Sequence, residues 1–388
     1  MAQDVNVGRE ILPIPDQPYR GAVPFDARTA DAPKQALLHA PKSAPNVVIV
    51  LVDDMGFGIP SAFGGCVNMP TTDRLAKGGL RYTHFHTTAL CSPTRAALLT
   101  GRNHHSVNMG VITEFGTSWP GATGMIPNTC ASIAQILKLN GYNTGQFGKC
   151  HEVPAWEQSI SGPFDRWPTG AGFEKFYGFL GGEMDQFEPV LFDGTTRVDP
   201  PKKPEEGYHL SDDLTDKAIG WIREQQTSTP DRPFFAYVAY GATHAPHQVP
   251  DSFRGRHKGQ FDKGWDKLRE ETLQRQKKAG VVPADAKLAG RPEGVNAWDE
   301  LTADMIAAPC LRLSLVLRST HASGDSSDRN RRPQGSASDG VHLRCGGLPE
   351  PRRTCARLCS RTRRVCSRMC ASQANARWEG RRRAIARR

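Results

Sequence analysis

Residues 46–54, NVVIVLVDD, place six aliphatic side chains in a row directly before two aspartates. An unbroken aliphatic run of this length is typical of a strand that is buried on both faces, as in a largely parallel sheet. Because Asp53 and Asp54 follow the run, we expect them at the C-terminal end of the strand, where open α/β sheets collect their functional sites. The run therefore predicts a largely parallel sheet and places a candidate functional site at the C-terminal end of this strand.

Three further segments extend this pattern. Residues 131–149 have the pattern of a helix, a turn and a short strand that carries Lys149 and His151 near its end. Residues 211–226 have the apolar spacing of one helical face, and residues 233–247 begin as a second β-rich run. Alternating helices and buried strands predict an α/β sandwich with a mixed, largely parallel central sheet.

The stretch CSPTRAALLTGR, residues 91–102, predicts a helix that begins beside a cysteine. Pro93 suits a first helical turn, and Gly101 is a suitable stop. Cys91 would then lie at the helix N-terminus, where free N–H groups favour an anion. Arg95, one turn further on, can point back to the same place. The stretch predicts an anion pocket with a reactive atom; a buried structural cysteine is the alternative.

Five other polar residues fall where predicted strands end. Asp53 and Asp54 can supply hard oxygen ligands to Ca²⁺ or Mg²⁺, although solvated turn residues would have the same sequence. Lys149 offers a point charge for an anion and His151 can relay protons; both would face one side of a strand. The alternative for this pair is exposed polar residues. His244 could protonate a leaving group.

Taken together, these features resemble the sulfatase family of the alkaline-phosphatase-like superfamily, in particular bacterial arylsulfatases with an N-terminal arm. Cys91–Arg95 matches the signature Cys-x-Pro-x-Arg, and Thr100–Arg102 matches the Thr-Gly-Arg that follows it. The other matching motifs are VDDMGFG (52–58), GKCHE (148–152) and THAPH (243–247). Four motifs in the family's order, within residues 45–308, make the resemblance specific.

The resemblance implies a modified nucleophile. In this family a separate formylglycine-generating enzyme oxidises the signature cysteine, here Cys91, to formylglycine. The aldehyde hydrates, one hydroxyl attacks the sulfur of a small-molecule sulfate ester, and the alcohol or phenol leaves. The second hydroxyl then collapses to the aldehyde and expels sulfate, which is covalent catalysis with a self-cleaving ester.

The resemblance also implies roles for individual residues. The predicted catalytic residues are Cys91, Arg95, Lys149, His151 and His244, and the predicted sulfate-binding residues are Lys149 and His244. Asp53 and Asp54, together with the modified Cys91, would hold Ca²⁺, with Mg²⁺ as the second choice. Arg95 would hold the hydrate, and His151 would support it and accept a proton during elimination.

The end of the chain departs from the family. The family completes its metal site with a later Asp-Asn pair and uses a second, later lysine on the sulfate. This chain has no Asp-Asn, and its last lysine is Lys287. Residues 309–388 hold 19 Arg, no Lys and 5 acids, which gives this segment a net charge of +14. Because the whole chain has a net charge of +10, residues 1–308 have a net charge of −4. We hypothesise that this tail is out of frame or an alternative ending.

These observations predict three parts. Residues 1–44 would form an extended arm, residues 45–308 the N-terminal part of a catalytic domain, and residues 309–388 a disordered Arg/Cys-rich tail. The C-terminal part of the fold would then be missing, and the chain could be inactive. Sulfatase sequence in another frame after residue 308, with Asp-Asn-Gly and then a lysine, would support the frameshift.

Alternative functions stay open at this point. A phosphonate monoester or phosphodiester hydrolase of the same superfamily can carry the same signature. A catalytically dead fragment whose basic tail binds nucleic acid is the non-enzyme alternative, although nucleic acid is not the expected partner. A zinc site at Cys355, Cys359, Cys366 and Cys370 would have non-standard spacing. The unpaired cysteines, with no secretory or membrane-spanning pattern, predict a cytoplasmic protein.

Overall fold

The protein is described from a computed structural model. The structure describes residues 11–13, 21–29, 38–253 and 259–301. The whole of the predicted tail, residues 309–388, lies outside these ranges, and so do its zinc-like cysteines and its nucleic-acid-binding surface. Of the predicted arm, residues 1–44, the described end packs against the body, because Ala40 and Ala44 contact a buried apolar cluster.

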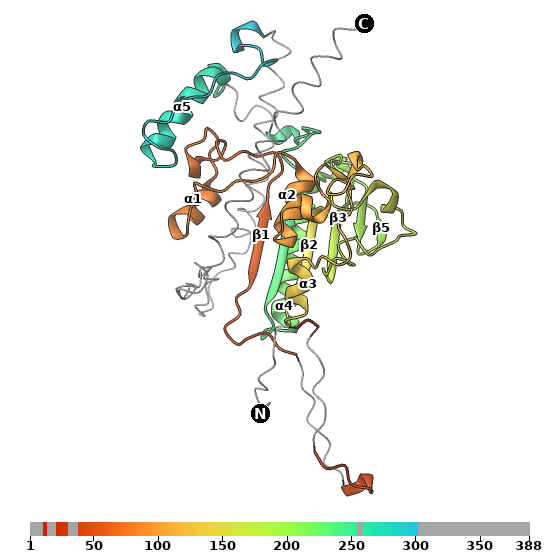
Figure 1. The fold of residues 1–388 in the computed structure, drawn as a ribbon. Helices are drawn as coiled ribbons and strands as arrows, with labels where there is room; N and C mark the ends of the chain where they lie inside the picture. The colour runs from red at the N-terminus through yellow and green to blue at the C-terminus, as the bar shows by residue number, and fades with distance from the viewer. Residues whose placement is uncertain (1–10, 14–20, 30–37, 254–258, 302–388) are drawn as a thin grey trace. The chain divides into compact units, whose positions relative to one another are not determined.

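Six strands form one mixed sheet in the described part of the chain (Figure 1). They are β1 (Val47–Leu51), β2 (Asn143–Lys149), β3 (Lys175–Phe179), β4 (Leu191–Asp193), β5 (Thr196–Val198) and β6 (Phe234–Ala239). Their order across the sheet is β1-β6-β2-β3-β4-β5. The pairs among β1, β6, β2 and β3 are parallel, and β4 and β5 are added antiparallel. The predicted mixed, largely parallel sheet is confirmed.

The helices connect and flank these strands. They are α1 (Pro70–Gly78), α2 (Cys91–Thr100), α3 (Ile133–Lys138), α4 (Leu210–Ser228) and α5 (Gly264–Lys278). Short 3₁₀ turns lie at Ala27–Thr29, Ser61–Phe63, His104–Val107, Thr113–Phe115, Ala155–Glu157, Pro204–Glu206, Asp251–Phe253 and Trp298–Glu300. None of the helices in the described ranges combines the length and the apolar character that a bilayer crossing requires.

Helix α2 has the predicted bounds. It begins at Cys91 and ends before Gly101, whose φ of +65° allows its N–H to cap the carbonyl of Ala97. This left-handed conformation is the one that glycine adopts at low cost at a helix C-terminus. The stop is therefore a local property of the sequence.

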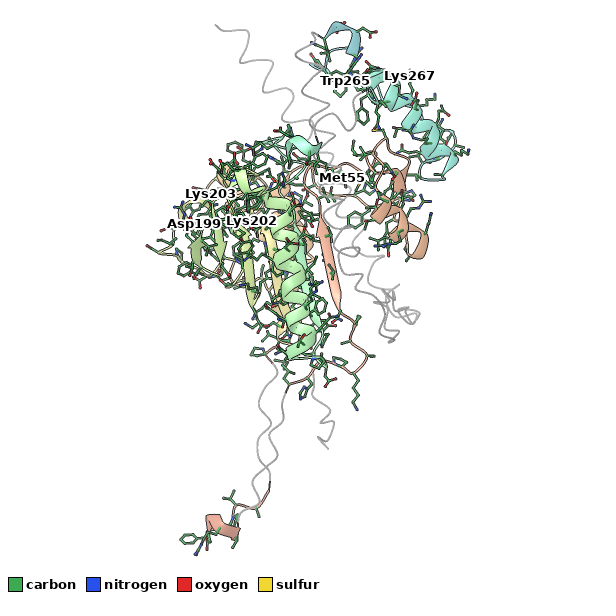
Figure 2. All side chains as sticks on the ribbon, turned by 180° about the vertical axis from the view of Figure 1, so that it is seen from behind. Met55, Asp199, Lys202, Lys203, Trp265 and Lys267 are labelled. Atoms are coloured by element: carbon green, nitrogen blue, oxygen red, sulfur yellow. The ribbon has the colours of Figure 1, made fainter. Side chains whose placement is uncertain are left out.

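The sheet has a buried cluster on each face. Alternate residues of β6 divide between the two, because side chains of a strand point to opposite sides. Phe234, Ala236 and Val238 pack in the same cluster as Trp221 of α4. Phe235, Tyr237 and Ala239 pack in the other cluster, with Leu99 of α2 and Ala134 of α3. Figure 2, seen from behind, shows α4 running along the strands; its labelled Trp265 lies on α5, with its ring edge-on to Trp298.

One prediction about β1 is wrong. The aliphatic run was expected to be buried on both faces, but Val48 is 41% exposed and Val50 is 51% exposed. Within the described residues β1 pairs with β6 alone and forms the edge of the sheet. Val47, Ile49 and Leu51, on the opposite face, pack against the cluster below α2 and α3. An aliphatic run indicates a strand but not its position in the sheet.

Candidate active site

Asp53 and Asp54 follow β1, as predicted, but they have different environments. The backbone of Asp53 donates to the carbonyl of Ala242 and accepts from the N–H of Thr243, at 3.1 and 2.8 Å. These bonds continue the β1–β6 pairing and hold the Asp53 side chain inside, where it is 7% exposed. Asp54 has a φ of +55°, and its side chain is 62% exposed. One carboxylate is thus buried and the other points outward.

Asp53 lies between two buried cations. Lys149, the last residue of β2, pairs through Nζ with Oδ2 of Asp53. Arg95, one turn into α2, places Nη2 3.5 Å from Oδ1, and its Nη1 donates to the carbonyl of Lys149 at 3.0 Å. The side chains of Arg95 and Lys149 are 1% and 0% exposed. Two cations facing one carboxylate leave a net positive charge, which suits an anionic ligand.

Cys91 lies beside this charge. It is half-buried and is the first residue of α2, with Leu90 as the N-cap. Burial raises the pKa of the Cys91 thiol, but the neighbouring His151 ring and the Lys149 charge lower the pKa more, so it lies below its ordinary value. The prediction of a cysteine at a helix N-terminus, in an electropositive setting, is confirmed. Such a setting is typical of reactive thiols and not of inert core cysteines.

His151 lies near Cys91, but not on the predicted strand. Strand β2 ends at Lys149, and His151 has a φ of +60°, which is incompatible with a continuing strand. The expected alternation of the two residues along one strand is therefore wrong. The ring of His151 also lies against Gly182, where an added Cβ would be 2.7 Å from Cε1. A side chain at position 182 would displace the imidazole.

Glu114 holds the His151 ring in place, a contact that sequence reasoning missed. Nε2 of His151 lies 3.0 and 2.9 Å from the two carboxylate oxygens of Glu114. Because an ionised carboxylate can only accept, Nε2 must carry the hydrogen. Nδ1 is buried and has no hydrogen-bond partner among the described residues, so it is the nitrogen left for chemistry. Glu114 belongs to none of the quoted motifs, and its sequence context gives no signal.

The pKa values of this pair have a consistent physical cause. The hydrogen bond from His151 lowers the pKa of Glu114 to about 2, although burial opposes the shift. Burial alone would lower the pKa of His151, but Cys91 and Glu114 raise it above its ordinary value. The pair therefore stabilises the fold most between the ordinary pKa values of a glutamate and a histidine. It loses this effect as pH falls toward 2, and again as pH rises through the raised pKa of His151.

We expect Glu114→Gln to lower the pKa of His151, because the imidazolium loses its counter-charge while the shape of the site is kept. Histidine ring signals followed by NMR across a pH titration measure this shift. Glu188→Gln, at an exposed glutamate that is not among the groups shifting the pKa of His151, is the control and should leave the titration unchanged. An unchanged pKa of His151 in Glu114→Gln would show that the pair is only a close contact.

His244 completes the group from the loop after β6. Its Nε2 lies 3.7 Å from Oδ2 of Asp54, and its Nδ1 lies 3.9 Å from Oε2 of Glu183. Nδ1 is also 2.9 Å from the carbonyl of Ala245, an acceptor, so Nδ1 carries a hydrogen. The side chain is 25% exposed. His244 is thus a partly accessible imidazole with two carboxylates nearby.

The structure brings all seven predicted residues together at the C-terminal ends of the parallel strands. Asp53, Arg95 and Lys149 are in contact, Cys91 and His151 are neighbours of Lys149, and His244 lies near Asp54. The elements that carry them are β1, β2, β6 and α2 or the loops directly after those strands (Figure 1).

The described residues do not by themselves form a calcium site. Asp53 and Asp54 offer hard oxygens of the kind that Ca²⁺ prefers. However, both oxygens of Asp53 already face cations, from Lys149 and Arg95. Across the described ranges no group of three or more His, Cys, Asp or Glu residues could hold a metal ion. The two aspartates are at most part of a metal site.

Comparisons with known proteins agree with the motifs. The sulfatase family model matches residues 45–329. An uncharacterised sulfatase of Schizosaccharomyces pombe is 32% identical over 68% of this chain and 50% of its own length. The arylsulfatase of Klebsiella aerogenes is 29% identical over 68% of this chain and 56% of its own length. The chain thus spans about half the length of these curated relatives.

The fold has solved counterparts as well. The crystal structure of yidJ from Bacteroides fragilis, described as a candidate sulfatase, covers 75% of this chain and 59% of its own. The TM-score is 0.53 at 21% sequence identity. At this identity the likeness supports the α/β fold alone.

Proposed function

The chain belongs to the sulfatase family, and on that premise we propose that its site hydrolyses sulfate monoesters of small molecules. The observation that carries the proposal is the position of Cys91, at the start of α2 and beside the buried cations Arg95 and Lys149. A nucleophile there would face a sulfate group held by positive charge. A relative named as an arylsulfatase supports an aryl ester as the first substrate to test.

The proposed nucleophile is formylglycine, made from Cys91 by a formylglycine-generating enzyme. When present, this group supplies a hydrated aldehyde with one hydroxyl for attack and a second for release. Cys91 and the four residues after it carry the Cys-x-Pro-x-Arg signature for such an enzyme. Half-burial at a helix start supports the proposal, because Cys91 lies close to the Lys149 charge and is still partly accessible.

The remaining roles follow from geometry and charge. Lys149 and Arg95 would bind and neutralise the sulfate oxygens, since Asp53 leaves one positive charge uncompensated. Nδ1 of His151 would accept a proton from the nucleophile, while Glu114 keeps the hydrogen on Nε2 and stabilises the imidazolium that forms. His244 would donate from Nε2 to the leaving oxygen when protonated, and the Asp54 and Glu183 carboxylates lie within 4 Å of its ring.

A divalent cation is the proposed partner of this site, with Ca²⁺ preferred to Mg²⁺. Asp53 and Asp54 would contribute two ligands, and further ligands would have to come from outside the described residues. We expect calorimetric titration to detect Ca²⁺ binding that Asp54→Asn weakens on the order of tenfold or more. Glu188→Gln is the charge-matched control. Tighter binding of Mg²⁺ than of Ca²⁺, or no effect of Asp54→Asn, would refute this part of the proposal.

The function is tested by assaying the full chain, produced together with a formylglycine-generating enzyme, on an aryl sulfate and on an aryl phosphodiester. The proposal expects a larger kcat/KM for the sulfate. A larger value for the phosphodiester would assign the site to the other branch of the superfamily. No turnover of either substrate, with a folded chain and a modified Cys91, would mean that the described site is not sufficient.

A further inference from the structure

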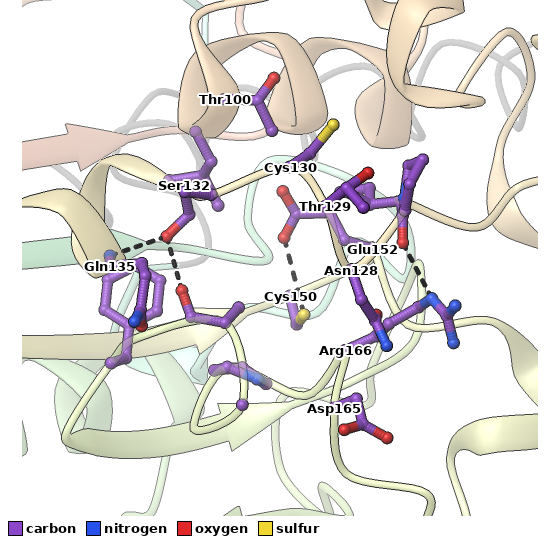
Figure 3. Close-up of a pocket in the computed structure, with 18 of the residues that line it drawn as sticks. Thr100, Asn128, Thr129, Cys130, Ser132, Gln135, Cys150, Glu152, Asp165 and Arg166 are labelled. Atoms are coloured by element: carbon purple, nitrogen blue, oxygen red, sulfur yellow. Dashed lines mark hydrogen bonds between the residues drawn. The ribbon is translucent and has the colours of Figure 1, made fainter. Parts of the chain in front are cut away.

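A cavity of about 380 Å³ lies next to β2. It is enclosed by the end of α2, the segment leading into α3 and the loop of residues 165–173 (Figure 3). None of the seven residues of the candidate active site lines it. Its walls are partly apolar, with Leu99, Ile126 and Phe173, and its volume exceeds the roughly 30 Å³ of one water molecule many times.

Two of the residues that line the cavity each carry a buried oxygen that accepts no hydrogen bond from the described residues. Glu152 is 5% exposed, and its Oε2 accepts from the thiol of Cys150 at 3.6 Å (Figure 3). Oε1 of Glu152 has no partner among the described residues. Oε1 of Gln146, which is also fully buried, has none there either. Unpaired buried acceptors are costly, so this cavity favours a ligand that brings hydrogen-bond donors.

The charge of the lining favours a cation. Asp165 adds a second carboxylate, while the one cationic side chain named in the lining, Arg166, is already engaged. Nη1 of Arg166 pairs with Oε1 of Glu157 at 2.6 Å, and its Nε donates to the carbonyl of Ile126 at 2.9 Å. Glu152 therefore has no free cation beside it among the side chains that line the cavity, although the charge of Arg95, outside the lining, acts on it.

We propose that this cavity binds a small alkylammonium ion, with the ammonium group on Glu152 and Gln146 and the alkyl part against Leu99, Ile126 and Phe173. A metal ion suits the cavity less well, since the described residues contain no group of three or more ligating His, Cys, Asp or Glu side chains. An alkylammonium ion has both the donors that the buried oxygens need and the apolar surface that the walls can cover.

The ionisation of Glu152 gives the site a pH dependence. Burial raises the pKa of this carboxyl to about 7, although the Arg95 charge lowers it. The other titratable groups facing it are the Cys150 thiol, the Tyr237 hydroxyl and the His151 ring. Because the ammonium keeps its charge across this range, affinity should rise about tenfold between pH 6 and pH 8, as Glu152 becomes ionised.

The test is calorimetric titration of the full chain with n-butylammonium chloride, and with n-butanol as the neutral probe of similar shape. We expect saturable binding of butylammonium at pH 8 that is at least tenfold tighter than that of butanol. Glu152→Gln, which keeps the shape of the side chain, should remove that preference. The control Glu188→Gln, at an exposed position outside the cavity, should keep it.

A second variant keeps the proposal testable if Glu152→Gln disturbs folding. Cys130→Phe fills the cavity from its half-buried side without changing any charge, and it should abolish butylammonium binding. Equal binding of butanol and butylammonium would overturn the proposal. An unchanged affinity of a folded Glu152→Gln variant for butylammonium would also overturn it. If neither probe showed saturable binding, the cavity would hold only water and the proposal would be wrong. None of these readouts depends on sulfatase activity, so the two proposals fail separately.

Discussion

Replacing Cys91 with alanine is expected to lower kcat/KM for an aryl sulfate on the order of 10⁴-fold or more. The variant removes the only atom from which the proposed nucleophile can be made, while Arg95 and Lys149, the residues proposed to bind the sulfate, are kept. The loss should therefore appear mainly in kcat, with little change in KM. Steady-state kinetics of the full chain, produced with a formylglycine-generating enzyme, measure both parameters.

Cys130→Ala is the matched control for that result. Cys130 is also a half-buried free thiol, but it lines the separate cavity beside β2. Its replacement should leave kcat/KM within about twofold of the parent value, because it touches none of the seven site residues. Retention of a substantial share of activity in Cys91→Ala would contradict the proposed mechanism, whatever the control shows.

Asp53→Ala is expected to destabilise the folded chain by about 3–5 kcal/mol, the usual range for breaking a buried ion pair. The reason is that Arg95 and Lys149 are almost fully buried, and both would lose their shared counter-ion. The same change should also abolish hydrolysis. Urea unfolding followed by circular dichroism gives the free energy of unfolding, with the slope compared between variants.

Asp54→Ala separates the loss of stability from the loss of hydrolysis. The Asp54 side chain is 62% exposed, and its nearest ionic partner, His244, lies 3.7 Å away, so its removal should cost less than about 1 kcal/mol. Hydrolysis should nevertheless be lost if both aspartates hold the proposed cation. If Asp53→Ala and Asp54→Ala lowered the free energy of unfolding equally, the buried ion pairs of Asp53 with Arg95 and Lys149 would not contribute to stability as proposed.

The fold class could be predicted from the sequence because it depends on local patterns. The run at residues 47–52 and the β-rich run after Pro233 became parallel neighbours in the sheet, β1 and β6. The exposure of Val48 and Val50 could not be predicted, because a strand's place in the sheet depends on which other strands pair with it. Aliphatic content carries no such information.

The candidate site was predictable wherever a motif placed a residue at the end of an element. Cys91, Asp53 and Lys149 all lie where the sequence predicted. Glu114 was missed because its contact with His151 spans 37 residues and depends on a left-handed turn that no motif encodes. The buried pair of Arg95 and Lys149 around one carboxylate was likewise visible only in three dimensions.

The central claim is that Cys91 acts as formylglycine in sulfate ester hydrolysis. The most direct measurement is mass spectrometry of the peptide containing Cys91, on samples of the full chain with graded exposure to a formylglycine-generating enzyme. Each sample is assayed for turnover of an aryl sulfate. We predict that activity rises in proportion to the fraction of Cys91 converted to the aldehyde. Hydrolysis by a chain whose Cys91 is entirely unmodified thiol would contradict the claim.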